Sequence, residues 1–300
     1  MPEEMREMIL TARDGMSIFI RAWIPDRPQR ILICIQGLGG HGGYYEELAA
    51  QLADEGIIVV APDLRGHGCS SGKRGDIDHF ESYLLDVDAA VMWTIDCWPH
   101  MPIFMLGESM GASLAIHYVT SAVKFPQVDV IPLVPAGLIL LSPVIRPTIH
   151  PTMREVIQFT RSLLTHPARP ALAVTGREEL GCRDVTFNTQ LQADPLFVRL
   201  VSARFLIKLG LWLRHTQKRA HLLHLPLLIL QGEHDHIAHP GATVAFIRRV
   251  GSKELKAITF PQAYHCLLHD PNTPAVINAL TSWLTIFEQV SSLIHERHLR

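Results

Sequence analysis

Short apolar runs alternate with helical patterns along most of the chain. Residues 17–24 alternate between apolar and polar positions, and with the segment before them they predict an antiparallel hairpin that turns at Asp14-Gly15. Further runs are almost continuously apolar, as expected of parallel strands with helices on both faces. These runs cover residues 31–35, 57–61, 103–106, 138–141, 227–230 and 257–260.

Helical periodicity fills most of the gaps between these runs. The candidate helices cover residues 44–54, 77–97, 109–124, 241–250 and 273–290. Because strand and helix alternate repeatedly, we predict an α/β protein whose mostly parallel central sheet is flanked by helices and joined by right-handed crossovers.

One connection is much longer than the others. Roughly 85 residues separate Leu141 from Leu227 without a convincing strand, although connections in compact domains are usually short. The segment is helical in character, and Met153, Ile157 and Leu164 share one face. We therefore predict a helical cap, residues 144–216, inserted into a core made of residues 1–143 and 217–300. The alternative is a set of extra helices packed on the core.

The composition limits the class of protein. Hydrophobic residues make up 48% and charged residues 19%, which fits a folded domain, and the net charge of −2 gives no reason to expect a nucleic-acid partner. No unbroken apolar run approaches the roughly 20 residues of a membrane span. The first residues do not resemble a signal peptide. Five scattered cysteines without a Cys-x-x-Cys pair indicate reduced thiols and predict a cytoplasmic protein.

A candidate nucleophile follows the apolar run 103–106. The motif Gly107-Glu-Ser109-Met-Gly111 fits Gly-x-Ser-x-Gly and leads into a helical pattern. A serine at the tip of such a sharp turn has a strained backbone, and side chains two positions away would collide with the neighbouring elements. Ser109 is therefore the predicted nucleophile; the alternative is a glycine-rich turn that only connects two elements.

A serine hydroxyl needs a base and an orienting carboxylate to become reactive. Asp235 lies just after the run 227–230 and His265 just after the run 257–260, so both occupy loops that follow strands, in the expected order of serine, acid and histidine. The alternatives are Glu233, Asp184 or Asp194 as the carboxylate and His269 as the base. Histidines also flank Asp235, but no second ligand cluster accompanies them, so we predict no metal site.

A glycine-rich loop supplies candidate oxyanion donors. Five glycines occur among residues 36–43, where the backbone can approach a substrate closely. We predict that the amides of Leu38 and Met110 stabilise the tetrahedral oxyanion. Phosphate binding by this loop is the alternative, but the usual glycine spacings for it are absent.

With these residues the chain resembles the monoacylglycerol lipase and lysophospholipase branch of the α/β-hydrolases over most of its length. The most specific motif is Asp63-x-Arg-Gly-His-Gly-x-Ser70 followed by Gly72, whose residues we expect to buttress the site rather than react. The other matching segments are Gln36-Gly37-Leu38-Gly-Gly-His41 with Tyr45, Gly107–Gly111, Asp194-Pro195-Leu196, Asp235 with Pro240, and Tyr264-His265.

The resemblance implies the α/β-hydrolase fold, the triad Ser109, Asp235 and His265, and cleavage of an ester with a medium or long acyl chain. It implies no cofactor. The candidate substrate contacts are Gly37, His41, Met153, Ile157 and Phe205. One departure is that Gln36 stands where the family usually has histidine, and the cap is the least similar part.

The predicted reaction is two-step acyl transfer on a small, lipid-like acyl ester. The serine attacks the carbonyl, the alcohol leaves, and water then hydrolyses the acyl-enzyme. Alternative activities on the same triad are those of a thioesterase, an acyltransferase or a small-molecule carboxylesterase; a catalytically silent homologue that binds a lipid or hormone is a different class. The apolar cap allows a peripheral membrane contact without requiring it.

Overall fold

A computed structural model describes residues 2–121, 123–125, 128–130, 133–148, 151–174 and 178–298. Its centre is an eight-stranded sheet in the order β1-β2-β4-β3-β5-β8-β11-β12. The first two strands and the β2–β4 pair are antiparallel, and β3, β4, β5, β8, β11 and β12 run parallel to one another. The strands are β1 (Glu4–Thr11), β2 (Ser17–Ile24), β3 (Arg30–Ile35), β4 (Ile57–Pro62), β5 (Ile103–Glu108), β8 (Gly137–Leu141), β11 (Leu227–Gly232) and β12 (Leu255–Phe260).

The predicted mostly parallel sheet and its leading hairpin are confirmed. The turn at Asp14-Gly15 is closed by a backbone hydrogen bond from Ala12 to Met16, and Gly15 has a φ of 82°. The prediction for the last strand was partly wrong, because most positions of β12 are exposed or half-buried. Among the described residues this strand is at the edge of the sheet beside β11, and its exposed positions show that it is not covered on both faces.

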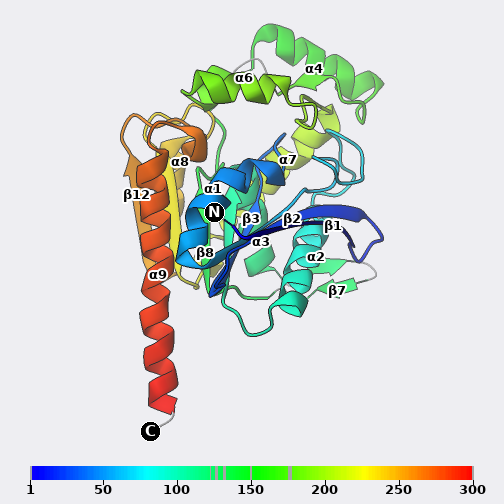
Figure 1. The fold of residues 1–300 in the computed structure, drawn as a ribbon. Helices are drawn as coiled ribbons and strands as arrows, with labels where there is room; N and C mark the ends of the chain where they lie inside the picture. The colour runs from blue at the N-terminus through cyan, green and yellow to red at the C-terminus, as the bar shows by residue number, and fades with distance from the viewer. Residues whose placement is uncertain are drawn as a thin grey trace.

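Helices cover both faces of the sheet (Figure 1). Alternate residues of β3 belong to different hydrophobic clusters: Ile33 packs with buried side chains of α2 (Ser82–Cys97) and α3 (Met110–Thr120), and Leu32 packs with those of α1 (Glu46–Leu52) and α9 (Thr273–His298). The helix α8 (Pro240–Ile247) contributes to the first cluster.

Three predicted helices extend further in the sequence pattern than in the structure, one of them being α8, which ends at Ile247 and not at residue 250. Residues 77–81 precede α2 without joining it, and α3 ends at Thr120. Beyond α3, position 122 lies outside the described residues, and the short strands β6 (Val123–Phe125) and β7 (Val128–Val130) form a separate hairpin that the pattern did not predict.

The long connection after β8 is mainly helical, as predicted. Figure 1 shows α4 and α6 together at one end of the molecule, with α7 between them and the sheet. The elements are α4 (Met153–Thr165), β9 (Leu172–Ala173), α5 (Glu178–Gly181), α6 (Val185–Ala193), β10 (Leu200–Val201) and α7 (Ala203–Lys218), and the two short strands pair with each other. Because α7 places Phe205 and Trp212 in the hydrophobic cluster that contains side chains of α2 and α3, this last helix of the predicted cap packs in the core. The division at residues 144 and 216 stays a prediction.

Candidate active site

The turn between β5 and α3 places Ser109 in an unusual backbone conformation, with φ 55° and ψ −115°. The flanking glycines are sterically required. A Cβ atom on Gly111 would lie 2.1 Å from the carbonyl oxygen of Ile35, and one on Gly107 would lie 2.5 Å from the carbonyl oxygen of Gly111. Since both obstacles are backbone atoms that cannot rotate away, the Gly-x-Ser-x-Gly spacing follows from packing of the turn against β3 and α3.

Three side chains from different loops meet at this turn. The Oγ atom of Ser109 lies 2.8 Å from Nε2 of His265, and Nδ1 of His265 lies 2.8 Å from Oδ2 of Asp235. Because an ionised carboxylate only accepts hydrogen bonds, Nδ1 carries the proton of the neutral imidazole and Nε2 accepts from the serine hydroxyl. This tautomer is the one a general base needs to activate the serine.

The carboxylate of Asp235 is held from several sides. Its Oδ1 accepts from the amides of Ile237 and Ala238, each at 2.8 Å, and its Oδ2 accepts from Nε2 of Gln231 at 2.7 Å. Burial raises the pKa of Asp235, but His265 and the two backbone amides outweigh burial and leave the pKa lowered. Burial likewise lowers the pKa of His265, and the Asp235 carboxylate outweighs it, so that this pKa is raised. The pair therefore favours an imidazolium beside a carboxylate, the state formed when the serine loses its proton.

The glycine loop lies against the serine. A Cβ atom on Gly37 would lie 3.0 Å from Cβ of Ser109, so the next amide, that of Leu38, is close to the turn. Within the described part of the chain, the amides of Leu38 and Met110 donate no hydrogen bond to another protein group. Nε2 of Gln36 donates to the carbonyl oxygen of Gly40 at 2.5 Å and so closes the loop on itself. Two free amides beside a nucleophile are what an oxyanion hole requires.

Comparison with known proteins identifies the family. Residues 26–272 match the Hydrolase_4 family model, which is described as serine aminopeptidase, S33. The chain belongs to this S33 family. Monoacylglycerol lipase of Mycolicibacterium smegmatis is 26% identical over 276 residues, which cover 90% of this chain and 93% of the relative. Human monoglyceride lipase is 27% identical over 291 residues, which cover 96% and 90%.

The solved structures agree on the architecture. A soluble variant of monoglyceride lipase from Saccharomyces cerevisiae, in complex with a substrate analog, has a TM-score of 0.77 at 19% identity and covers 94% of this chain and 97% of that one. At that identity the likeness concerns the fold. The predicted resemblance and the α/β-hydrolase fold are thus confirmed, and the protein is a serine hydrolase of the S33 family.

In this S33 hydrolase the glycine loop is tied to the cap region by Asp194. Its Oδ2 accepts from Nε2 of His41 at 2.9 Å and from the hydroxyl of Tyr44 at 2.5 Å. His41 has only 8% of its surface exposed, and its Nδ1 accepts from the amide of Gly43, so both ring nitrogens are engaged within the protein. His41, predicted as a substrate contact, thus connects the glycine loop to the segment before Phe197.

The motif that begins at Asp63 supports the same loop. Asp63 is fully buried, and its Oδ1 accepts from the amide of Gly42 at 2.7 Å and from Nη1 of Arg21 at 2.9 Å. Its Oδ2 accepts from the amide of Cys69 at 2.8 Å. A Cβ atom on Gly68 would lie 2.1 Å from the same carboxylate, which explains the glycine there. These contacts fit the expected buttressing role.

The other predicted substrate contacts are dispersed. Met153 and Ile157 lie on α4 with 74% and 62% of their surfaces exposed. Phe205 instead is fully buried on α7, with its ring centroid 5.5 Å from that of Phe80. A side chain without exposed surface does not touch a ligand in this conformation, so Phe205 is a core residue and not a substrate contact here.

The alternative acids and base have other partners. Glu233 accepts from the amide of Gln262, and Asp184 accepts from two amides at the start of α6. The imidazole of His269 stacks on the ring of Phe187 with centroids 3.8 Å apart. Within the described residues, none of these three has a hydrogen bond to Ser109 or His265.

Two polar groups at the site were missed by sequence reasoning. Glu108 accepts from the buried hydroxyl of Tyr45 at 3.0 Å, and burial raises the pKa of Glu108 although the nearby His265 opposes this. Gln231, which binds Asp235, also accepts from the hydroxyl of Thr243 at 2.9 Å. A polar residue at the end of an otherwise apolar strand, as both Glu108 and Gln231 are, was the available signal.

No group of His, Cys, Asp and Glu side chains suited to a metal ion occurs among the described residues. No helix in the described part of the chain is long and apolar enough to span a bilayer.

Proposed function

We propose that this hydrolase cleaves carboxylic esters of medium- or long-chain acyl groups, of the monoacylglycerol or lysophospholipid type, through an acyl-serine intermediate. The observation that carries the proposal is the hydrogen-bonded chain from Ser109 through His265 to Asp235, with both distances at 2.8 Å. Names of the relatives support the substrate class, because those proteins are called monoacylglycerol or monoglyceride lipases.

His265 acts twice in the reaction, first as a base and then as an acid. His265 removes the proton of Ser109 as its Oγ attacks the ester carbonyl, and Asp235 holds the imidazole and stabilises its cation. The amides of Leu38 and Met110 bind the oxyanion. His265 then returns the proton to the departing alcohol, and a water molecule, activated in the same way, releases the acid.

The test compares wild type with Ser109→Ala on p-nitrophenyl esters of increasing acyl length, on monoacylglycerols and on lysophospholipids. We expect ester turnover to vanish in the variant while circular dichroism stays unchanged. In the wild type, kcat/KM should rise with chain length, since each buried methylene contributes about 0.8 kcal/mol, or about fourfold. Retained turnover in Ser109→Ala would refute the assignment of Ser109 as the nucleophile. Equal kcat/KM for acetyl and decanoyl esters would refute the preference for longer acyl chains.

Further arms separate the alternatives. Acyl-thioester substrates and alcohol acceptors test for a thioesterase or an acyltransferase, and aminoacyl p-nitroanilides test the activity named in the family description. Labelling of Ser109 by a fluorophosphonate probe distinguishes a reactive serine from a silent binding protein, because only an activated hydroxyl reacts.

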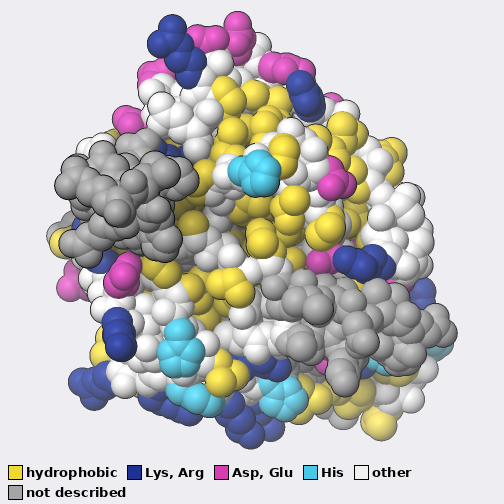
Figure 2. Space-filling view, turned by 90° about the horizontal axis from the view of Figure 1, so that it is seen from below, with side chains coloured by type: hydrophobic (Ala, Val, Ile, Leu, Met, Phe, Trp, Pro, Cys, Tyr) yellow, Lys and Arg dark blue, Asp and Glu magenta, His cyan; other side chains and the backbone are white. Residues whose placement is uncertain are grey.

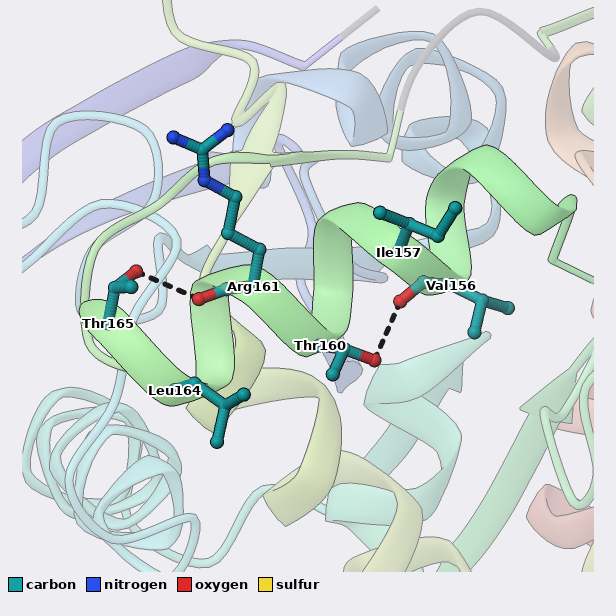
Figure 3. A pocket seen from close by; sticks show the side chains of 6 residues that line it. All are labelled: Val156, Ile157, Thr160, Arg161, Leu164 and Thr165. Atoms are coloured by element: carbon teal, nitrogen blue, oxygen red, sulfur yellow. Dashed lines mark hydrogen bonds between the residues drawn. The ribbon is translucent and has the colours of Figure 1, made fainter.

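We also propose that the cap region contacts membranes peripherally through α4. Support comes from its exposed apolar side chains, among them Met153 and Leu164, which are 74% and 79% exposed. Six residues of this helix line a shallow hollow that is open to solvent, and their side chains are shown in Figure 3: Val156, Ile157, Thr160, Arg161, Leu164 and Thr165. The hydroxyls of both threonines donate to carbonyls one turn back, so they need no outside partner, and Arg161 is the one charged side chain among the six.

A vesicle test needs a control because this face is not the only apolar surface. Figure 2 shows hydrophobic side chains gathered at the end of the molecule opposite α4 and α6. Val134, which is 67% exposed, precedes β8 and so lies at the end of the sheet away from Ser109. We expect Met153→Ser with Leu164→Ser to reduce co-sedimentation with phosphatidylcholine–phosphatidylglycerol vesicles and Val134→Ser to leave it unchanged. Equal binding by all three proteins would contradict a contact through α4.

We propose a cytoplasmic location on the basis of the cysteines. All five are free thiols in the structure, which suits a reducing compartment. Fractionation of cells that express the protein, with thiol titration of the purified product, tests this: disulfide-bonded product would contradict it.

A further inference from the structure

Ser142 lies directly after β8, the strand between those that carry Ser109 and Asp235. Its side chain is fully buried. The Oγ atom donates to the carbonyl oxygen of His265 at 2.6 Å, and the amide donates to the carbonyl oxygen of Leu230 on β11 at 2.8 Å. Through two hydrogen bonds, one residue therefore joins the strand before the acid to the backbone of the base.

The same segment also holds the nucleophile. The carbonyl oxygen of Leu141 accepts from the amide of Ser109 at 2.9 Å, and the amide of Val144 donates to the carbonyl oxygen of Ser109 at 3.3 Å. Residues 141–144 thus bond to the backbones of both Ser109 and His265. The relative position of the two reacting side chains depends on this short stretch of chain.

The backbone of Ser142 is in the left-handed region, with a φ of 43°. Glycine adopts this conformation without steric cost, whereas a residue with a Cβ is strained there. A serine at such a position places a hydroxyl that glycine lacks. The hydroxyl is used, because it supplies a hydrogen bond to a buried carbonyl whose other donor is the amide of Leu267 at 3.0 Å.

We propose that Ser142 is a positioning residue for the catalytic base: its hydroxyl fixes the backbone of His265 so that the imidazole lies between Ser109 and Asp235. This inference rests on the proposed function insofar as His265 is the base. The strained backbone of Ser142 lowers the free energy of unfolding, and the hydroxyl that it carries holds the active geometry.

Two substitutions separate the hydroxyl from the strain. Ser142→Ala removes the hydroxyl and keeps the strained Cβ, whereas Ser142→Gly removes both. We expect Ser142→Gly to unfold at a higher temperature than Ser142→Ala. In both variants we expect kcat to be lowered by about 10- to 100-fold and KM to change less than about threefold, since small misplacements of a reacting group have effects of this size. His100→Gly is the matched control, because His100 is exposed, has a φ of 72° and lies at the opposite end of β5.

A second readout does not depend on turnover. We expect the pKa of the His265 imidazole, followed by NMR, to fall in both Ser142 variants, because a displaced imidazole loses part of its contact with Asp235. Wild-type kcat in Ser142→Gly, or an unshifted imidazole pKa in both variants, would overturn the proposal. If Ser109→Ala abolishes turnover while Ser142→Gly keeps it, the proposed function stands and the positioning role of Ser142 is refuted. If the wild type hydrolyses no ester, the NMR titration alone decides whether Ser142 positions His265.

Discussion

Asp235→Asn preserves the shape of the side chain but replaces one acceptor oxygen by an NH2 group. The amides of Ile237 and Ala238 both donate to Oδ1 at 2.8 Å, so the oxygen of the new amide must remain at that position. The NH2 group then takes the place of Oδ2 and faces the Nδ1 proton of His265. Two donors cannot bond to each other, and the imidazole relieves the conflict by carrying its proton on Nε2 instead.

An imidazole protonated on Nε2 cannot accept the proton of Ser109, which lies 2.8 Å away. The loss of the correct tautomer in a serine triad lowers kcat by about 10⁴-fold, which corresponds to about 5 kcal/mol of transition-state stabilisation. Gln231 adapts more easily, because rotating its amide presents an oxygen to the new NH2 group. We therefore expect a large loss of activity with a much smaller loss of stability. The assay is kcat on a p-nitrophenyl ester together with urea unfolding.

Glu233→Gln is the control for charge near the site. This exposed carboxylate lies two residues before Asp235 and accepts from the amide of Gln262 at 3.0 Å. We expect its kcat to stay within about twofold of wild type, as for most surface substitutions. A kcat for Asp235→Asn within tenfold of wild type, or equal losses in the two variants, would refute the tautomer argument.

Four further outcomes are expected. Asp194→Asn removes the acceptor shared by two donors of the glycine loop and should lower the free energy of unfolding by about 1–2 kcal/mol in urea titrations and lower kcat as well; unchanged values would contradict a link between cap and loop. Gly111→Ala should destabilise the fold by about 3 kcal/mol or prevent folding, because its Cβ would lie 2.1 Å from a backbone oxygen of β3; a normal melting temperature would contradict the steric argument. Burial lowers the pKa of His265, but the carboxylate of Asp235 raises this pKa by more than burial lowers it. The acid limb of kcat/KM should therefore lie above pH 6.5. Glu108→Gln should move that limb to lower pH, since the charge of Glu108 also favours the imidazolium; an unmoved or upward limb would contradict this.

Local patterns in the sequence determined the central sheet and the position of the candidate nucleophile. Apolar runs predict buried strands because such runs gain most by leaving water, and this requirement does not depend on which element covers them. The glycines around Ser109 are likewise a local requirement, since their missing Cβ atoms would strike the backbone of the same turn and its neighbouring strand.

Other features depended on contacts between distant positions. Nothing near His41 in the sequence indicates that its imidazole bonds to Asp194 from the cap region, and the apolar character of Phe205 did not reveal whether it faces a ligand or the core. The hydroxyl of Ser142 reaches His265 only because β8 lies between β5 and β11. Strand order and helix packing decide such contacts, and these depend on how the whole chain fills its interior rather than on the period of any one segment.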